Sequence, residues 1–211
     1  MANVTDKKRA TYQDVLDAPE HMVAEIIGGE LQLSPRPGGP ATSVASRLGS
    51  MIQPPFGDGI GGPGGWIILD EPELHLAGEI MVPDLAGWKI ERLPTVPEGA
   101  AFTVVPDWVC EVLSPRSEST DRLRKLPLYA SFGVGHAWLV HPPRRSVEVF
   151  RLYDGKWLAI AAHVGNGLAR VEPFDAIELD LARLWANLPL QTKASEEAAE
   201  YDAYYGFSAA P

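Results

Sequence analysis

The spacing of apolar positions predicts a chain in which strands outnumber helices. Apolar residues that alternate with polar ones, or that form short runs rich in β-branched and aromatic side chains, are typical of strands. Such segments lie at residues 23–27, 30–33, 66–69, 73–76, 80–88, 108–113, 137–140, 147–152, 157–162 and 168–171. A helical period occurs at residues 11–18, 41–51, 117–132 and 180–187. This mixture predicts one α/β (α+β) domain with a mixed sheet and a few flanking helices.

Turn residues divide these segments and predict a hairpin near each end of the chain. Gly28-Gly29 and Tyr153-Asp-Gly-Lys156 each separate two strand candidates, and both sequences permit the positive φ of a tight turn. The Pro- and Gly-rich segments 34–40 and 54–65 predict loops, the second of them mobile. Pro127 falls inside the third helical segment, where it should kink or restart the helix.

Composition limits the class of protein. The chain has 211 residues, of which 45% are hydrophobic and 22% charged, as in an ordinary globular domain. We expect that domain at residues 10–190, between a polar tail at 1–9 and an acidic tail without fixed structure at 191–211. No apolar run is long enough to cross a bilayer, and no apolar stretch follows the basic residues near the N-terminus. A cytoplasmic protein is the resulting expectation.

Charge and cysteine content narrow the chemistry. Cys110 is the only cysteine, so the chain forms no internal disulfide or cysteine zinc cluster, and its apolar surroundings favour a core residue over a nucleophile. The formal net charge is −10, whereas proteins that coat DNA usually carry a basic surface. A protein of this composition that acts on nucleic acid therefore needs a local positive region or bound cations.

Two carboxylates lie inside apolar strand segments. Asp84 sits between Val82 and Leu85, and Glu111 interrupts the apolar segment 108–113. A carboxylate in a buried strand loses hydration, so it is rare there unless it is paired or binds a metal. Neighbouring strands would bring both groups to one edge of the sheet, where hard oxygen ligands suit Mg²⁺ or Mn²⁺.

A third group of charged residues lies on the helical segment 117–132. Asp121, Lys125 and Tyr129 recur at i, i+4 and i+8 and should therefore share one face. The apolar residues predicted to pack on the sheet from the opposite side are Leu123, Leu126 and Ala130. Lys125 would then bring an ammonium group to the carboxylate edge, where it could stabilise a pentacovalent phosphate or orient the attacking water.

These segments together resemble a known family. The chain resembles the Uma-type putative restriction endonuclease family, within the PD-(D/E)XK nuclease superfamily. The resemblance rests on Pro83-Asp84, Glu111-Val-Leu-Ser-Pro115, the spacing from Asp121 to Val134, and Trp138-Leu-Val140. Residues 24–31 are similar to the N-terminal hairpin of that family. The resemblance extends over roughly residues 10–190.

The resemblance implies a restriction-endonuclease-like fold and a function. The fold would be a mixed β-sheet flanked by helices, with additional N- and C-terminal hairpins. The function would be Mg²⁺-dependent hydrolysis of phosphodiester bonds in DNA, and cleavage of both strands would favour a homodimer. The implied site residues are Asp84 and Glu111 as metal ligands, Lys125 as the catalytic lysine, Glu25 as a further acid, and Asp121 and Tyr129 in support. The backbone carbonyl of Val112 is a candidate third ligand of the metal.

Some positions depart from the family pattern. The lysine that the superfamily usually places two residues after the acid is replaced by Leu113, and Lys125 matches a version in which it lies on the following helix. A histidine expected after the first Pro-rich loop is absent, with Thr42 or Ser43 nearby. The acidic and tyrosine pair before Trp138 is Gly135-His136-Ala137, and the usual Asp before the proline is His141.

Simpler interpretations remain open at each site residue. Glu111 could form a buried ion pair with Arg122 or Arg124, and Lys125 could be a solvated helix residue. Asp84 could open a turn, and Glu25 could be an exposed strand residue. The alternative function is a non-catalytic binding or regulatory module that retains the nuclease fold. Hydrolysis of another phosphoester is a third possibility.

Overall fold

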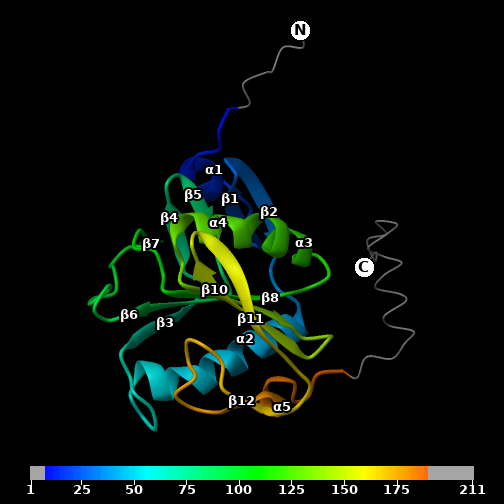
Figure 1. Cartoon of the computed structure of the whole chain (residues 1–211). Coiled ribbons are helices and arrows are strands. Elements are labelled where there is room, and N and C mark those ends of the chain that lie inside the picture. Colours follow the sequence, from blue (N-terminus) through cyan, green and yellow to red (C-terminus); the bar gives the residue numbers. More distant parts are fainter. Residues whose placement is uncertain (1–7, 190–211) are drawn as a thin grey trace.

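The computed structural model describes residues 8–189, whose strands form two main sheets placed one above the other in Figure 1. The five-stranded sheet has the order β2-β1-β5-β4-β7. Its strands are β1 (Met22–Ile27), β2 (Glu30–Pro35), β4 (Glu73–Leu76), β5 (Glu79–Met81) and β7 (Ala101–Phe102). Only β4 and β7 pair in parallel in this sheet.

The six-stranded sheet is the centre of the domain and has the order β11-β10-β9-β8-β6-β3. Its strands are β3 (Trp66–Asp70), β6 (Leu85–Lys89), β8 (Trp108–Val112), β9 (His136–His141), β10 (Ser146–Tyr153) and β11 (Lys156–Val164). The central pair β8 and β9 is parallel, and the remaining neighbours are antiparallel. A further small sheet joins β12 (Leu168–Ala169) to β13 (Leu179–Asp180). The predicted mixed α/β class with hairpins near both ends is confirmed.

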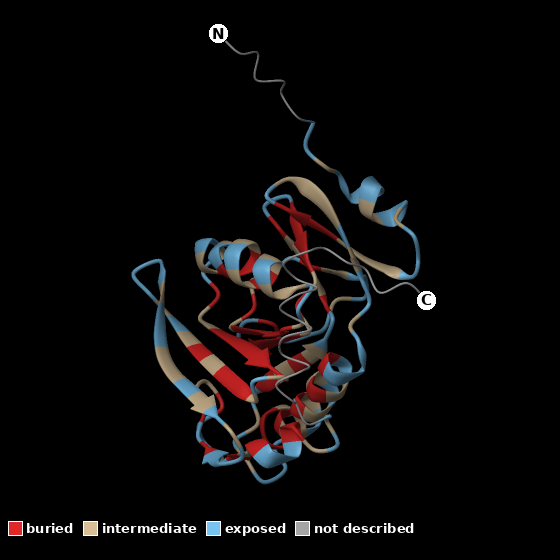
Figure 2. Ribbon diagram, turned by 90° about the vertical axis from the view of Figure 1, so that its right-hand side faces the viewer, coloured by how far each residue is buried: buried red, intermediate tan, exposed pale blue. Residues whose placement is uncertain are grey.

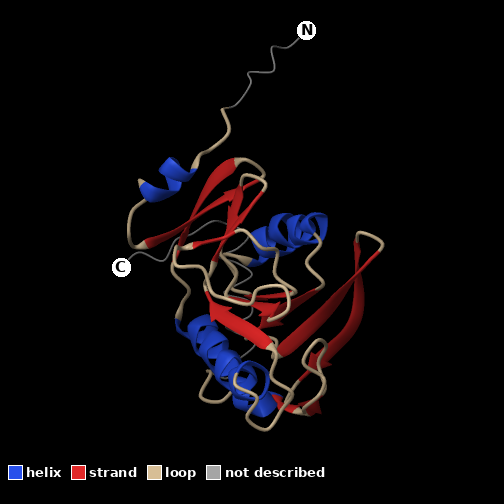
Figure 3. Ribbon diagram, turned by 90° about the vertical axis from the view of Figure 1, so that its left-hand side faces the viewer, coloured by secondary structure: helices blue, strands red, loops and turns tan. Residues whose placement is uncertain are grey.

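Helices cover both faces of the six-stranded sheet, as Figures 1 and 3 show. One face carries α2 (Gly39–Ile52) and α5 (Leu181–Leu184), and the other carries α3 (Glu118–Thr120), η2 (Asp121–Lys125) and α4 (Leu126–Phe132). The short helix α1 (Tyr12–Leu16) lies beside the five-stranded sheet, and η1 (Gln53–Gly57) continues α2. Among the residues described, no helix is both long and apolar enough to span a bilayer.

Two hydrophobic cores lie on opposite faces of the central sheet, and Figure 2 shows the buried residues concentrated in its middle strands. Trp108, Cys110 and Val112 of β8 join the core beneath α2 and α5. Val109 and Leu113 join the core beneath α4 and the five-stranded sheet. Because side chains alternate along a strand, Glu111 projects into the second side. Cys110 is fully buried, as expected of a core residue.

The prediction of one strand at residues 80–88 is wrong, and the break in this segment positions the site. The chain pairs as β5 in one sheet, leaves it at Val82-Pro83-Asp84, and pairs again as β6 in the other. Pro83 has no N–H to donate to a ladder and fixes its own φ, so a continuous central strand could not pass through it. This three-residue link therefore joins the two sheets.

The helical segment after β8 also differs from the expectation. Residues 118–132 form one helical run in which a π-turn precedes Pro127. The Leu126 N–H donates to the Asp121 carbonyl, one residue further back than in an α-helix. The wider turn accommodates the proline. Leu123 was expected to pack on the sheet, but its side chain is 71% exposed, so that prediction is wrong.

Part of the Gly/Pro-rich segment 54–65 is packed rather than loose. Its first residues belong to η1, and the Phe56 side chain is 1% exposed. The Phe56 ring centroid lies 4.7 Å from that of Phe174. An aromatic anchor of this kind fixes the start of the segment to the core. The acidic tail expected at 191–211 lies outside the described residues.

Candidate active site

The link between the two sheets is the point where the predicted site residues meet. The Val82 N–H donates to Glu25 Oε1 of β1 at 2.7 Å, and the Val82 carbonyl accepts from Lys125 Nζ at 3.0 Å. Two residues on, Asp84 Oδ2 accepts the Val112 N–H at 2.6 Å. The link at residues 82–84 thus forms hydrogen bonds with β1, with β8 and with the helical run 118–132.

Lys125 is the centre of a buried ionic cluster, here called the Lys125 centre, formed with Glu25, Glu111 and Asp121. Its Nζ lies 2.9 Å from Glu25 Oε1, 2.8 Å from Glu111 Oε1 and 3.9 Å from Asp121 Oδ1. Each of these residues is at most 6% exposed. The two close carboxylates and the Val82 carbonyl occupy the three donors of the ammonium group. The interpretation of Lys125 as a solvated helix residue is therefore wrong.

Tyr129 completes this cluster from the next turn of the helix. Its hydroxyl donates to Glu111 Oε1 at 2.6 Å, the same oxygen that Lys125 contacts. Asp121, Lys125 and Tyr129 share one helical face, as their spacing predicts, but that face points into the sheet rather than away from it. The ion pair suggested between Glu111 and Arg122 or Arg124 does not form. Arg122 pairs with Glu148, and Arg124 donates to the Ile27 carbonyl.

The carboxylates of the site are held near one another at a cost. Burial raises the pKa of Glu111 well above its usual value, and repulsion from Asp121, Asp84 and Glu25 adds to this shift, against attraction by Lys125. Burial likewise raises the pKa of Asp121. Burial alone would lower the Lys125 pKa, but Glu111 and Glu25 outweigh it and hold that pKa well above normal. Three carboxyl groups thus share a single lysine, and burial favours the neutral forms of Glu111 and Asp121.

Asp84 differs from the others because it borders a cavity. Burial raises its pKa from 3.8 to about 6, against the lowering effects of the Val112 N–H and Lys125. The cavity has a volume of about 470 Å³, within the range of small-molecule sites. Its lining includes Ser46, Gly49 and Ser50 of α2, Asp70 at the end of β3 and the following Glu71. Asp84 is thus the site carboxylate that a ligand in this cavity would meet.

The donor set can be tested for a divalent cation. Within residues 8–189, no three His, Cys, Asp or Glu side chains are arranged around a common metal position. Mg²⁺ is often held by only one or two carboxylates and keeps several waters. Asp84 and Glu111 flank the Val112 peptide, and the Lys125 and Tyr129 contacts of Glu111 both fall on Oε1. Hard oxygen donors that outnumber the single lysine fit such a cation.

The sequence missed the parts of this site that belong to the backbone. Val82 contributes its N–H and its carbonyl, and neither leaves a trace in residue type. The neighbouring Pro83 was the available signal, because a proline inside an apparent central strand marks a break. The acidic residues Asp70 and Glu71, which line the same cavity as Asp84, were also not singled out, although Asp70 ends β3 and Glu71 follows it directly.

Comparison with known proteins identifies a family and a similar fold. A family model described as "Uma2: Putative restriction endonuclease" matches residues 9–182. A crystal structure of a putative nuclease belonging to DUF820 from Anabaena variabilis ATCC 29413 is similar, with a TM-score of 0.64 and 22% sequence identity. The similarity covers 84% of this chain and 98% of that one, and shows a shared fold. No curated protein matches the chain. The chain belongs to the Uma2 family of putative restriction endonucleases.

Proposed function

We propose that the chain is a Mg²⁺- or Mn²⁺-dependent endonuclease that hydrolyses phosphodiester bonds in DNA. The observation that carries the proposal is Glu111, which lies buried in the central strand of the sheet, contacts Lys125, and is separated from Asp84 by a single peptide unit at Val112. A buried group of carboxylates with raised pKa values is costly to stability, and such groups gather at functional sites. The family description supports a nuclease.

Asp84, Glu111 and the Val112 carbonyl are the proposed ligands of the cation. When bound, Mg²⁺ or Mn²⁺ would polarise the scissile phosphate and supply a hydroxide nucleophile at neutral pH. Asp84 would present its carboxylate from the cavity side, where a phosphodiester strand could approach along α2. The Val112 N–H fixes the orientation of the Asp84 carboxylate through a 2.6 Å hydrogen bond.

Lys125 acts in this proposal mainly through Glu111. Its ammonium is enclosed by two carboxylates and a carbonyl, so direct contact with a phosphate would require one of these partners to move away. In place, Lys125 favours the ionised form of Glu111 against the effect of burial, and Tyr129 donates to the same oxygen. Glu25 and Asp121 balance the lysine and hold it between the two sheets.

A cytoplasmic homodimer is part of the proposal, because two copies of one site serve the cleavage of two strands. The outer edge of β11 offers a surface for it: Leu158 and Val164 are 48% and 73% exposed, and among the described residues β11 pairs with no strand other than β10. Uncovered apolar edge strands tend to pair with another chain. Sedimentation of a monomer at assay concentrations would remove the dimer from the proposal.

A plasmid-nicking assay tests the activity. Supercoiled DNA is incubated with the protein and Mg²⁺, Mn²⁺ or EDTA, and nicked and linear forms are separated on a gel. We expect nicking with either metal, none with EDTA, and loss by at least two orders of magnitude in Asp84→Asn and Glu111→Gln. Leu123→Ala, on the exposed side of the helix, is the matched control. Nicking that persists in both site variants would reject the proposed catalytic residues, and no nicking by the wild type would favour the non-catalytic module.

A further inference from the structure

An acidic nuclease needs a positive region for its substrate, and arginines gather at one edge of the central sheet. The parallel strands β8 and β9 are paired so that Val112 lies opposite Val140, and their carboxyl ends therefore coincide. The turns that follow are Ser114-Pro-Arg-Ser117 and His141-Pro-Pro-Arg-Arg145. They bring Arg116, Arg144 and Arg145 to the same edge, in a chain whose net charge is −10.

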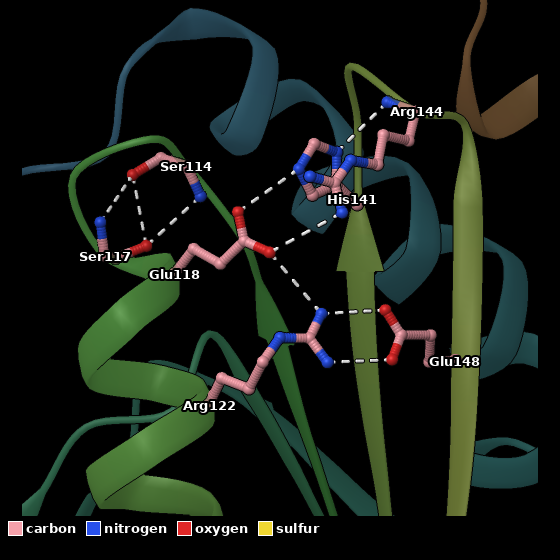
Figure 4. Close-up of polar contacts among 7 residues, drawn as sticks. All are labelled: Ser114, Ser117, Glu118, Arg122, His141, Arg144 and Glu148. Atoms are coloured by element: carbon pink, nitrogen blue, oxygen red, sulfur yellow. Dashed lines mark hydrogen bonds and ion pairs between the residues drawn. The ribbon is translucent and has the colours of Figure 1, made fainter. Parts of the chain in front are cut away.

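The two turns are joined to each other by a polar network, shown in Figure 4 and here called the Glu118 network. Glu118 Oε2 lies 3.5 Å from His141 Nε2, and Glu118 Oε1 lies 3.8 Å from Arg144 Nη1. The Arg144 N–H donates to His141 Nδ1 at 3.0 Å, which places the ring proton of neutral His141 on the nitrogen facing Glu118. Ser114 and Ser117 exchange hydrogen bonds at the first turn. Both turns are therefore fixed before any ligand arrives.

The arginines at this edge differ in how far they are engaged. Arg122 makes a two-pronged contact with Glu148, at 2.8 and 2.7 Å, and so belongs to the protein's own structure. Arg144 is 66% exposed and has only the long contact with Glu118. Arg116 and Arg145 form no side-chain ion pair or hydrogen bond with the rest of residues 8–189. Three guanidinium groups are thus open to an external anion.

The edge lies close to the proposed catalytic centre. Val112 donates to Asp84, and Arg116 follows Val112 by four residues, so their Cα atoms are at most about 14 Å apart. The DNA backbone carries a negative charge about every 1.7 Å along the helix axis when both strands are counted, so a duplex whose scissile phosphate reaches Asp84 also presents flanking phosphates at this edge.

We propose that Arg116, Arg144 and Arg145 form a contact surface for the phosphate backbone of duplex DNA next to the scissile bond, and that Glu118 competes with DNA for Arg144. The surface deepens the nuclease function proposed above and rests on it for its substrate. The three guanidinium groups supply charge and planar hydrogen-bond donors that match phosphate oxygens. Prolines in both turns limit the conformational freedom that binding would otherwise remove.

The test is DNA binding without catalysis. Fluorescence anisotropy of a labelled 30-base-pair duplex is measured in EDTA at several salt concentrations. We expect Arg116→Ala and Arg145→Ala each to weaken binding roughly 5- to 10-fold at 0.1 M salt, and to reduce the slope of log K against log salt by about 1. Arg183→Ala removes an exposed arginine from α5, on the other side of the sheet, and should leave both quantities unchanged.

The Glu118→Gln variant is expected to change DNA affinity in the opposite direction from the arginine variants. It removes a negative charge from the edge and releases Arg144, so DNA binding should tighten about 2- to 5-fold. A residue with a purely structural role would weaken binding when replaced. Circular dichroism of each variant shows whether the fold is retained.

The outcomes separate this surface from the nuclease function. Unchanged affinity in the Arg116 and Arg145 variants, in a protein that nicks plasmid, overturns the surface and leaves the function. Arginine-dependent binding without metal-dependent nicking supports the surface and removes the function. A wild-type chain that neither binds nor nicks DNA overturns both.

Discussion

The helical run 118–132 carries two ionic clusters that share a backbone and differ in almost everything else. The Lys125 centre faces the link between the sheets, and every charged side chain in it is at least nine-tenths buried. The Glu118 network lies one turn towards the N-terminus, where the side chains of Glu118, Arg122 and Glu148 are 27–31% exposed. The comparison shows that the ion pairs of the Glu118 network stabilise the fold, whereas the buried carboxylates of the Lys125 centre lower its stability.

Charge balance makes the difference. In the Glu118 network, Arg122 lowers the pKa of Glu148, and Glu148 raises the pKa of Arg122, so each partner stabilises the charged form of the other. In the Lys125 centre, three carboxylates surround one lysine, and burial raises the pKa values of Glu111 and Asp121. The first arrangement stabilises the fold modestly, whereas the second gathers more carboxyl groups than its one lysine can pair with, and a bound cation would favour their ionised forms.

The largest effect is expected from removing the lysine. Lys125→Ala leaves Glu25 and Glu111 buried without their cation, and it should destabilise the protein by about 3–5 kcal/mol at pH 7. Urea denaturation followed by circular dichroism measures this loss. Lys125→Met keeps most of the side-chain volume, so it distinguishes lost charge from lost packing. A loss below about 1 kcal/mol in both variants would contradict the buried centre.

A smaller effect, with the opposite sign, is expected at Asp84. Its folded pKa of about 6 lies above the ordinary 3.8, so the folded state binds the proton more tightly than the unfolded state does. The stabilisation from this proton is full below pH 4 and is lost as the pH rises through 6. The shift corresponds to at most about 3 kcal/mol.

Asp84→Asn should therefore be more stable than the wild type at pH 7, and the advantage should shrink as the pH falls towards 4. Thermal unfolding between pH 4 and 8 measures this difference. Saturating Mg²⁺ should stabilise the wild type and leave Asp84→Asn unaffected. A variant less stable than the wild type at pH 7 would show that the Val112 hydrogen bond outweighs the cost of burial.

Breaking an ion pair of the Glu118 network should change the stability of the fold much less than removing Lys125. A double-mutant cycle on Arg122→Ala and Glu148→Ala should give a coupling energy of about 0.5–1 kcal/mol, because both side chains are partly exposed to solvent. The coupling should fall in 1 M salt, whereas the effect of Lys125→Ala should change little. A coupling energy above about 3 kcal/mol would mean that the Arg122–Glu148 pair behaves like a buried ion pair and would contradict the difference between the two clusters.

The smallest effect is expected at Leu123, on the same helical run. Its side chain is 71% exposed, so Leu123→Ala should change stability by less than about 0.5 kcal/mol. The original packing prediction for this residue would instead require a loss of about 2–5 kcal/mol. The same urea experiment decides between them.

The sequence predicted most strands because alternation and turn chemistry are local signals. The hairpin turn at Asp154-Gly155, where both residues have positive φ, is an example. The direction of the helix face at Asp121, Lys125 and Tyr129 was not predictable in the same way, because two carboxylates on other strands make a buried ammonium possible. The meeting of Glu25 with Glu111 depends on the two sheets joining at Pro83, which is a tertiary property. The backbone groups of Val82 carry no sequence signal.

The most direct test of the central claim is a calorimetric titration of Mn²⁺ into the wild type, Asp84→Asn and Glu111→Gln, with Arg183→Ala as the control. We predict saturable binding to the wild type and the control, and its loss in both site variants. Binding that survives in Asp84→Asn and Glu111→Gln, or that is absent from the wild type, would contradict a cation site at these two carboxylates.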